Sequence, residues 1–124
     1  MNEPLQFALV QEDVDEHTVV IVVEGELEIT TAPRFKQLLV KAVDERKRAI
    51  VVDFSGLSFI DSTALGVLIA AQRRMHDDDA RLAIVCTHPQ VLNVFEITGI
   101  DTAFRIHPDR AAALAQVRAA NLQA

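Results

Sequence analysis

Residues 51–75, VVDFSGLSFIDSTALGVLIAAQRRM, decide the fold of this chain because they place a buried strand shortly before an apolar helix. Residues 49–54 (AIVVDF) are a continuous apolar run broken by one aspartate, which is typical of a strand buried on both faces. Ser55 and Gly56 then predict a turn. Asp61 and Ser62 predict the start of a helix that continues to Met75.

The residues before this segment predict two strands and a helix. Residues 5–10 and 19–23 are short β-branched runs, and the acidic residues 11–16 between them predict a turn, so the pair is interpreted as a hairpin. Thr30 and Thr31 offer a helix cap, and Pro33 follows where its missing N–H is harmless. Apolar residues then recur at the spacing of one helix face: Phe35, Leu38, Leu39, Ala42 and Val43.

The residues after this segment continue the alternation of strand and helix. Residues 81–86 predict a strand, and residues 88–98 predict a helix that begins near Pro89 and ends at Gly99. Residues 103–106 predict a short edge strand, and the Ala-rich residues 109–122 predict a closing helix. The order of elements predicts an α/β fold, with about four helices on a mixed sheet of four to five strands that is parallel at its centre.

The composition of the whole chain predicts a single cytoplasmic domain over residues 1–124. The chain is 50% hydrophobic and 24% charged, which excludes an intrinsically disordered protein. Its apolar stretches are too short to span a bilayer, and its acidic N-terminal segment does not resemble a secretory leader. The single cysteine, Cys86, cannot form an internal disulfide and has no metal-ligand spacing, so no metal or other cofactor is expected.

Acidic residues are concentrated in the first third of the chain. Residues 1–33 contain eight aspartates and glutamates and no lysine or arginine, within a chain of net charge −6. This acidic third either faces a basic partner or forms a solvated surface that aids solubility. The acidic balance, the absence of Trp and Tyr and the lack of a basic stripe argue against nucleic acid as a partner.

Ser62 is the principal candidate functional residue. It lies at the predicted start of a helix, where several backbone N–H groups have no partner within the helix. One interpretation is structural, with Asp61 or Ser62 accepting those hydrogen bonds as a cap. The other is functional, because the same N–H groups and the helix dipole favour an anion such as a phosphate on Ser62.

The helix that begins at Ser62 has hardly any polar face for nearly two turns. A helix that is apolar all round is either fully buried or partly a docking surface, and full burial is difficult in a small domain. Both alternatives, full burial of the helix and a docking surface at its start, remain open at this point. The candidate contact residues are Asp61, Ser62, Thr63, Ala64, Leu65, Val67 and Leu68.

Four other residues near Ser62 have weaker support. Thr63 is the competing phosphoacceptor, although its place in the first turn favours a local backbone hydrogen bond. Ser55 and Ser58 are interpreted as turn residues. Asp53, at the end of the buried strand, either orients the Ser62 loop or serves as a turn residue.

The sequence contains no recognisable metal or catalytic motif. Residues 76–79 (HDDD) lack the spacing of a calcium loop and are interpreted as a solvated turn, and the other histidines define no ligand spacing. Neither a glycine-rich phosphate loop nor a serine-hydrolase elbow occurs.

Two stretches resemble the motifs of the STAS domain, the module shared by sulphate transporters and anti-sigma-factor antagonists. They are residues 25–39 (GELEITTAPRFKQLL) and residues 53–68 (DFSGLSFIDSTALGVL), and residues 98–100 (TGI) are similar to the family's ending of a later helix. The order of elements agrees with the family over nearly the whole chain, which is identified as a stand-alone STAS domain of the antagonist type. Glu28 replaces the family's usual aspartate, and Ala64 replaces a common glycine or serine.

The resemblance implies a regulatory protein and not an enzyme. Unphosphorylated antagonists bind an anti-sigma factor that is also a serine kinase, and this binding releases the sigma factor. The residue that matches the family's phosphoacceptor is Ser62, whose phosphorylation would abolish binding until a metal-dependent serine phosphatase removes the phosphate. Asp53 and Glu28 are expected to support the adjacent loop, and the free protein is expected to be a monomer.

Two alternative functions remain open. The chain is alternatively an accessory subunit of a membrane lipid-transport complex, docking through the helix at residues 62–75 without being phosphorylated. The third hypothesis, an enzyme with Ser62 as its nucleophile, lacks the accompanying base and oxyanion motifs.

Overall fold

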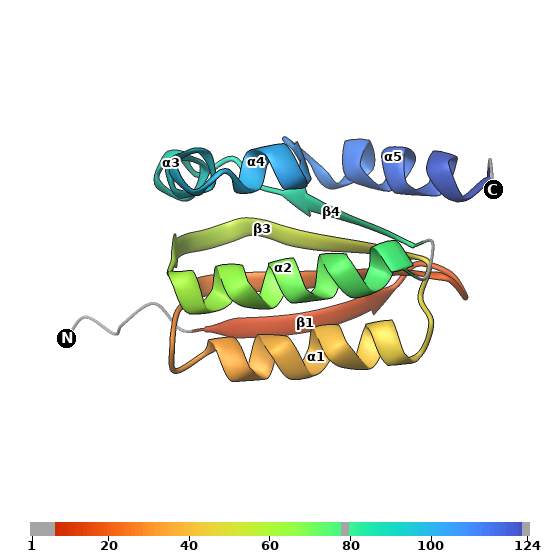
Figure 1. The fold of residues 1–124 in the computed structure, drawn as a ribbon, viewed down its shortest axis with the longest axis horizontal. Coiled ribbons are helices and arrows are strands. Elements are labelled where there is room, and N and C mark those ends of the chain that lie inside the picture. Colours follow the sequence, from red (N-terminus) through yellow and green to blue (C-terminus); the bar gives the residue numbers. More distant parts are fainter. Residues whose placement is uncertain (1–6, 78–79, 123–124) are drawn as a thin grey trace.

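The central layer of the molecule is a mixed five-stranded sheet (Figure 1). The computed structural model describes residues 7–77 and 80–122 of the chain. β1 (Ala8–Asp13) pairs antiparallel with β2 (Thr18–Leu27), and β3 (Ala49–Ile60), β4 (Arg81–Val85) and β5 (Arg105–His107) follow in parallel, in the order β1-β2-β3-β4-β5. The mixed sheet with a parallel centre is confirmed.

Five helices, counted over the described residues, cover the sheet unequally. They are α1 (Ala32–Asp44), α2 (Ser62–Asp77), α3 (Pro89–Thr98), α4 (Ile100–Ala103) and α5 (Arg110–Leu122). The crossovers β2-α1-β3, β3-α2-β4 and β4-α3-α4-β5 step in one direction across the sheet, so right-handed connections place α1 to α4 on one face. α5 packs on the other face, which we call the outer face.

Each face of the sheet has its own apolar cluster. On the face of α1 to α3, the ring of Phe54 lies 6.0 Å from that of Phe35 and 6.3 Å from that of Phe95, centroid to centroid. On the outer face, α5 contributes two fully buried residues to a smaller cluster made of Val20, Ala49, Val51, Ala83, Val85, Ala113 and Val117. The β3 strand is therefore buried on both faces up to Asp53, as its apolar run predicts.

The predicted turn at residues 11–16 is wrong in its first half. Gln11, Glu12 and Asp13 belong to β1, where they pair with Ile21, Val20 and Val19 of the buried strand β2. Pairing with a buried strand therefore outweighs the local preference of these polar residues for a turn. The part of the predicted strand at residues 5 and 6 lies outside the described residues.

The predicted turn at Ser55 and Gly56 is also wrong, because β3 continues without interruption to Ile60. Gly56 pairs with Glu24 of β2, and the hydroxyl of Ser58 donates to the carbonyl oxygen of Gly25 at 3.1 Å. The pairing of β3 with β2 has two register shifts, one after Asp53 and one after Leu57. At each shift β3 contains one residue more than β2.

The ends of the helices agree with the sequence in most places. Gly99 ends α3 in the left-handed conformation, with φ of 79°. Thr31 occupies the cap position of α1, but its hydroxyl donates to the carbonyl oxygen of Glu26 at 2.8 Å and makes no cap hydrogen bond. Ala103, expected in the last strand, instead ends the short helix α4.

Two further expectations, the turn at residues 76–79 and the lack of a membrane-spanning helix, can be compared only with the described residues. The turn at residues 76–79 lies partly outside them, since residues 78 and 79 are not described. Over the described ranges 7–77 and 80–122, no helix is long and apolar enough to cross a bilayer.

Candidate functional site

The carboxyl ends of β2 and β3 bring two loops together at one edge of the sheet. Leu27, the last residue of β2, pairs with Ile60, the last residue of β3. The N–H of Asp61 then donates to the carbonyl oxygen of Leu27 at 3.1 Å. The start of α2 is thereby fixed beside the loop that leads from β2 into α1.

Asp61 is the residue that caps α2. Its carboxylate oxygen Oδ1 accepts a hydrogen bond from the N–H of Ala64 at 3.2 Å, and its carbonyl oxygen accepts from the N–H of Leu65 at 3.2 Å. Of the two residues that the sequence offers as caps, it is therefore Asp61 that satisfies the helix end.

The side chain of Ser62 is free because Asp61 caps the helix. Ser62 is exposed, and among the described residues its hydroxyl has no hydrogen-bond partner. Thr63 is exposed as well, and the expected bond of its hydroxyl to the local backbone is not formed within the described chain. Two adjacent hydroxyls are thus presented to solvent at the positive end of a 16-residue helix.

Three of the expected contact residues are buried. Ala64 and Leu68 have no exposed surface and Leu65 has 5%, so these side chains pack in the core and cannot meet a partner. Helical periodicity explains the difference, because one stripe of α2 must face the sheet while the rest of its apolar residues remain outside. The exposed stripe consists of Ser62, Thr63, Gly66, Ile69, Ala70 and Arg73, with Val67 half-buried at its margin.

Ile29 is an apolar residue near Ser62 that sequence reasoning missed. It lies in the loop between β2 and α1, and its side chain is 66% exposed. That loop adjoins Asp61 through the bond to Leu27. A large apolar residue inside a polar loop was the signal that could have identified it.

Glu28 organises the loop in which it lies. Its carbonyl oxygen accepts from the N–H groups of Thr31 at 3.0 Å and Ala32 at 2.7 Å. Its carboxylate accepts from the N–H of Thr30 at 3.2 Å and also from the hydroxyl of Thr30. Glu28 therefore holds the turn that adjoins α2, and its effect on Ser62 stays a prediction.

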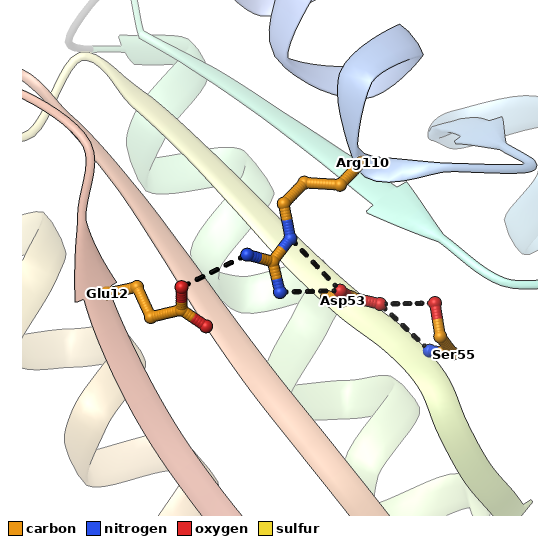
Figure 2. A network of polar contacts seen from close by, with 4 residues as sticks. All are labelled: Glu12, Asp53, Ser55 and Arg110. Atoms are coloured by element: carbon orange, nitrogen blue, oxygen red, sulfur yellow. Dashed lines mark hydrogen bonds and ion pairs between the residues drawn. The ribbon is translucent and has the colours of Figure 1, made fainter.

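Asp53 lies on the outer face, in a cluster of polar contacts (Figure 2). Its Oδ1 accepts from the N–H of Ser55 at 2.9 Å and from the hydroxyl of Ser55 at 2.6 Å. Its Oδ2 accepts from Arg110 of α5, from Nε at 3.3 Å and from Nη2 at 3.1 Å. Nη1 of the same arginine donates to Glu12 of β1 at 3.0 Å.

The hydrogen bonds of Asp53 therefore lead to α5 and not to the loop of Ser62. Burial alone would raise the pKa of the Asp53 carboxyl, but the hydrogen bonds from Ser55 and Arg110 outweigh burial and hold the pKa below its ordinary value of 3.8. Sequence reasoning missed Arg110, because 57 positions separate it from Asp53.

The chemistry available to Ser62 depends on the groups that can form hydrogen bonds with its hydroxyl. No histidine or carboxylate of the described chain forms a hydrogen bond with Ser62. In residues 7–77 and 80–122, no group of three or more His, Cys, Asp and Glu side chains is placed to hold a metal ion. A nucleophilic serine needs an activating base within hydrogen-bond reach, and within these ranges Ser62 has none.

Several known proteins are similar to this chain. A curated anti-sigma-B factor antagonist of Staphylococcus aureus is 28% identical over 87 residues, which are 70% of this chain and 81% of the relative. The crystal structure of an anti-sigma factor antagonist from Mycobacterium paratuberculosis is 28% identical, with a TM-score of 0.83 over 91% of this chain and 95% of that one. The structure of the anti-sigma factor antagonist SpoIIAA in its unphosphorylated form is 26% identical, with a TM-score of 0.79 over 90% of this chain and 97% of that one.

The family model described as STAS domain matches residues 10–113. This range begins within β1, contains the other four strands in full and ends in the first turn of α5. The protein therefore belongs to the STAS domain family.

Proposed function

We propose that this protein is an anti-sigma factor antagonist that works by partner switching in the cytoplasm. The unphosphorylated form binds an anti-sigma factor with serine kinase activity and releases its sigma factor. The kinase phosphorylates Ser62 and so ends the interaction, and a metal-dependent serine phosphatase restores it. The protein is a binding partner and a substrate in this cycle, and it performs no catalysis. The names of the similar proteins support the first part of this proposal.

One observation carries the assignment of Ser62. Asp61 performs the capping role, so the hydroxyl of Ser62 has no structural duty among the described residues and is exposed for transfer of a phosphoryl group. A serine used as a cap would have to give up its hydrogen bond before it could react.

The surroundings of Ser62 explain how a phosphate can act as a switch. A phosphoserine adds a charge of about −1.5 to −2, which the start of a helix tolerates while the domain is free. At an interface that includes the apolar residues Ile29 and Ile69, the same phosphate must lose its water, and the neighbouring carboxylate of Asp61 repels it. A differential of about 5.5 kcal/mol would change occupancy of the complex from 99:1 to 1:99.

The experiment is to measure the affinity of variants for the kinase encoded nearest to this gene, by calorimetry without ATP. We expect Ser62→Ala to bind as tightly as the wild type and Ser62→Asp to bind at least tenfold more weakly. Thr63→Ala and Thr63→Asp test the neighbouring hydroxyl on the same exposed stripe, and Thr63→Asp should weaken binding less than Ser62→Asp does. Equal affinity of Ser62→Ala and Ser62→Asp would exclude the charge switch.

A second measurement locates the modification in the native cell. Trypsin releases residues 49–73 as one peptide that contains Ser55, Ser58, Ser62 and Thr63, so fragmentation is needed to place the phosphate. We expect phosphate on Ser62 that disappears under stress. A Ser62 that is never modified would favour the accessory subunit of a lipid-transport complex instead.

A further inference from the structure

The outer face of the sheet is only half covered. α5 begins at Arg110, which contacts Asp53, and Arg118 near its end contacts Asp15 in the turn between β1 and β2 at 2.6 Å. α5 therefore runs from Asp53 back toward the start of the strands. β4 likewise pairs with β3 only as far as Asp53. Beyond Asp53, no element of the described ranges 7–77 and 80–122 packs on the outer face.

The register of the strands defines the residues of this uncovered area. Val10 is directly opposite Val22, and Val22 is opposite Asp53 and borders the outer cluster. Because side chains alternate between faces, the following outer residues of β2 are Glu24 and Glu26. We call the area the outer patch; it consists of Val10, Val22, Glu24, Glu26, Gly56 and Phe59.

The two register shifts of β3 place Phe59 in the outer patch. After Asp53, β3 uses three positions where β2 uses two, so Gly56 pairs with Glu24. A second surplus position, Ser58, brings Phe59 beside Glu26. Regular alternation from Gly56 would have placed Phe59 on the buried face. The shifts leave its side chain 49% exposed, and Val10 is 51% exposed.

The outer patch is flat and about as wide as one helix. A Cβ atom at Gly56 would lie 2.8 Å from Cγ of Glu24, so the Glu24 side chain lies across the glycine instead of rising from the sheet. Strands about 4.8 Å apart make three strands about 10 Å wide, which equals the diameter of a helix. α5 shows that a helix packs on this face farther along the same sheet.

The charge of the outer patch limits what can cover it. Its two charged residues, Glu24 and Glu26, are both acidic and exposed, whereas Arg110 at the border of the patch is already paired with Glu12 and Asp53. A second copy in a symmetric pair would place the outer patch against itself, and none of its six residues is a cation that could pair with the glutamates. A helix with apolar residues on one side and flanking lysines or arginines is complementary to the apolar residues of the patch and to its acidic charge.

We propose that the outer patch is a docking surface for a basic amphipathic helix of a partner protein, separate from the exposed stripe of α2 that contains Ser62. The acidic bias of the first third of the chain then has a binding role, because two of its glutamates flank Val10, Val22 and Phe59.

The test is a titration of the isotopically labelled full chain with a synthetic 14-residue helical peptide that has leucines on one face and lysines beside them, followed by NMR. We expect saturable amide shifts confined to residues 8–12, 22–26 and 55–59. A peptide of the same composition in scrambled order should bind at least tenfold more weakly. Shifts centred on α1 and α2, or equal binding of the scrambled peptide, would overturn the proposal.

Variants separate specific docking from attraction to any acidic surface. The double change Glu24→Gln and Glu26→Gln keeps side-chain shape and should weaken the peptide at least fivefold, as should Val10→Ser. The matched control, Glu96→Gln with Asp101→Asn, removes two exposed acidic charges from α3 and α4 and should change affinity less than twofold. If the control pair lowers the affinity for the peptide equally, the loss reflects net charge alone and the proposed site is refuted.

Sedimentation of the unliganded chain tests the competing occupant. We expect a monomer at the concentrations of the titration. A dimer that Val10→Ser dissociates would assign the outer patch to a second copy and would contradict the proposal.

Discussion

At the scale of single residues, Asp53 is a buried side chain whose hydrogen bonds link two elements. It is 6% exposed, and its two oxygens accept four hydrogen bonds, from Ser55 of its own strand and from Arg110 of α5. A buried carboxylate is tolerated only where such donors replace water. Asp53 therefore joins the middle of the sheet to the first turn of α5.

Replacement of Asp53 is expected to destabilise the fold. Asp53→Asn keeps the shape of the side chain but removes the negative charge to which Arg110 and Ser55 donate hydrogen bonds. The free energy of unfolding, measured in urea, should therefore fall by about 1–3 kcal/mol. The control is Asp44→Asn, because the ion pair of Asp44 with Arg74 is about half exposed on both sides and should contribute less than about 0.5 kcal/mol. Equal effects of the two changes would show that the cluster does not anchor α5.

The same carboxyl predicts how stability depends on pH. Its pKa is lower in the folded chain than in the unfolded chain, so its contribution is complete above pH of about 4 and is lost as the pH falls through the folded value. The difference in unfolding free energy between the wild type and Asp53→Asn should therefore be constant from pH 7 to about 5 and shrink below about 4. Urea titrations at a series of pH values measure it, and a difference that grows in acid would contradict the assignment.

The residue scale also shows what a sequence can reveal about a site. The position of Ser62 was predictable, since an Asp-Ser pair before an apolar run is a local signal for a helix start. The partner of Asp53 was not predictable, because Arg110 and Glu12 approach it only through the folded sheet. Contacts between residues far apart in sequence have no local pattern.

At the scale of elements, α2 combines a packed stripe with an exposed one. Ala64, Leu65 and Leu68 face the core, whereas Gly66 and Ala70 lie outside. A Cβ atom at Gly66 would have no atom within 4 Å among its described neighbours. A Cβ atom would therefore fit at Gly66, and its absence leaves the helix surface low near Ser62.

Gly66→Ala is expected to stabilise the protein. A glycine within a helix lowers the free energy of unfolding by about 0.5–1 kcal/mol relative to alanine, because glycine loses more conformational freedom on folding than alanine does. The free energy of unfolding should rise by that amount, and the reverse change at the exposed Ala70, Ala70→Gly, should lower it similarly. Destabilisation by Gly66→Ala would mean that the surface at this position is more crowded than the structure indicates.

Elements with regular periodicity were predictable, and irregular ones were not. The apolar positions of α1, including Phe35 and Leu39, are buried as their spacing predicts. The continuation of β3 through Ser55 and Gly56 was missed, because these are ordinary turn residues and only pairing with β2 makes them extended. The short helix α4 was missed since four residues are too few for a period.

At the scale of the whole molecule, phosphorylation of Ser62 is expected to leave the fold unchanged. The phosphate would project into solvent from a helix that Asp61 already caps. In the NMR spectrum of the protein phosphorylated on Ser62, shifts of amide signals should be confined to residues 28–31 and 61–66. Changes that extend to β4 or α5 would instead indicate a conformational switch. Thr63→Ala, phosphorylated in the same way, controls for modification of the neighbouring hydroxyl.

The hydrogen bond from the N–H of Asp61 to the carbonyl oxygen of Leu27 joins two main-chain groups. Every amino acid except proline supplies the same N–H, and every amino acid supplies the same carbonyl oxygen. Substitutions accumulated over generations can therefore alter the chemistry of both loops while the place of the serine stays fixed. The two loops can therefore change their side chains without having to rebuild the backbone that positions Ser62.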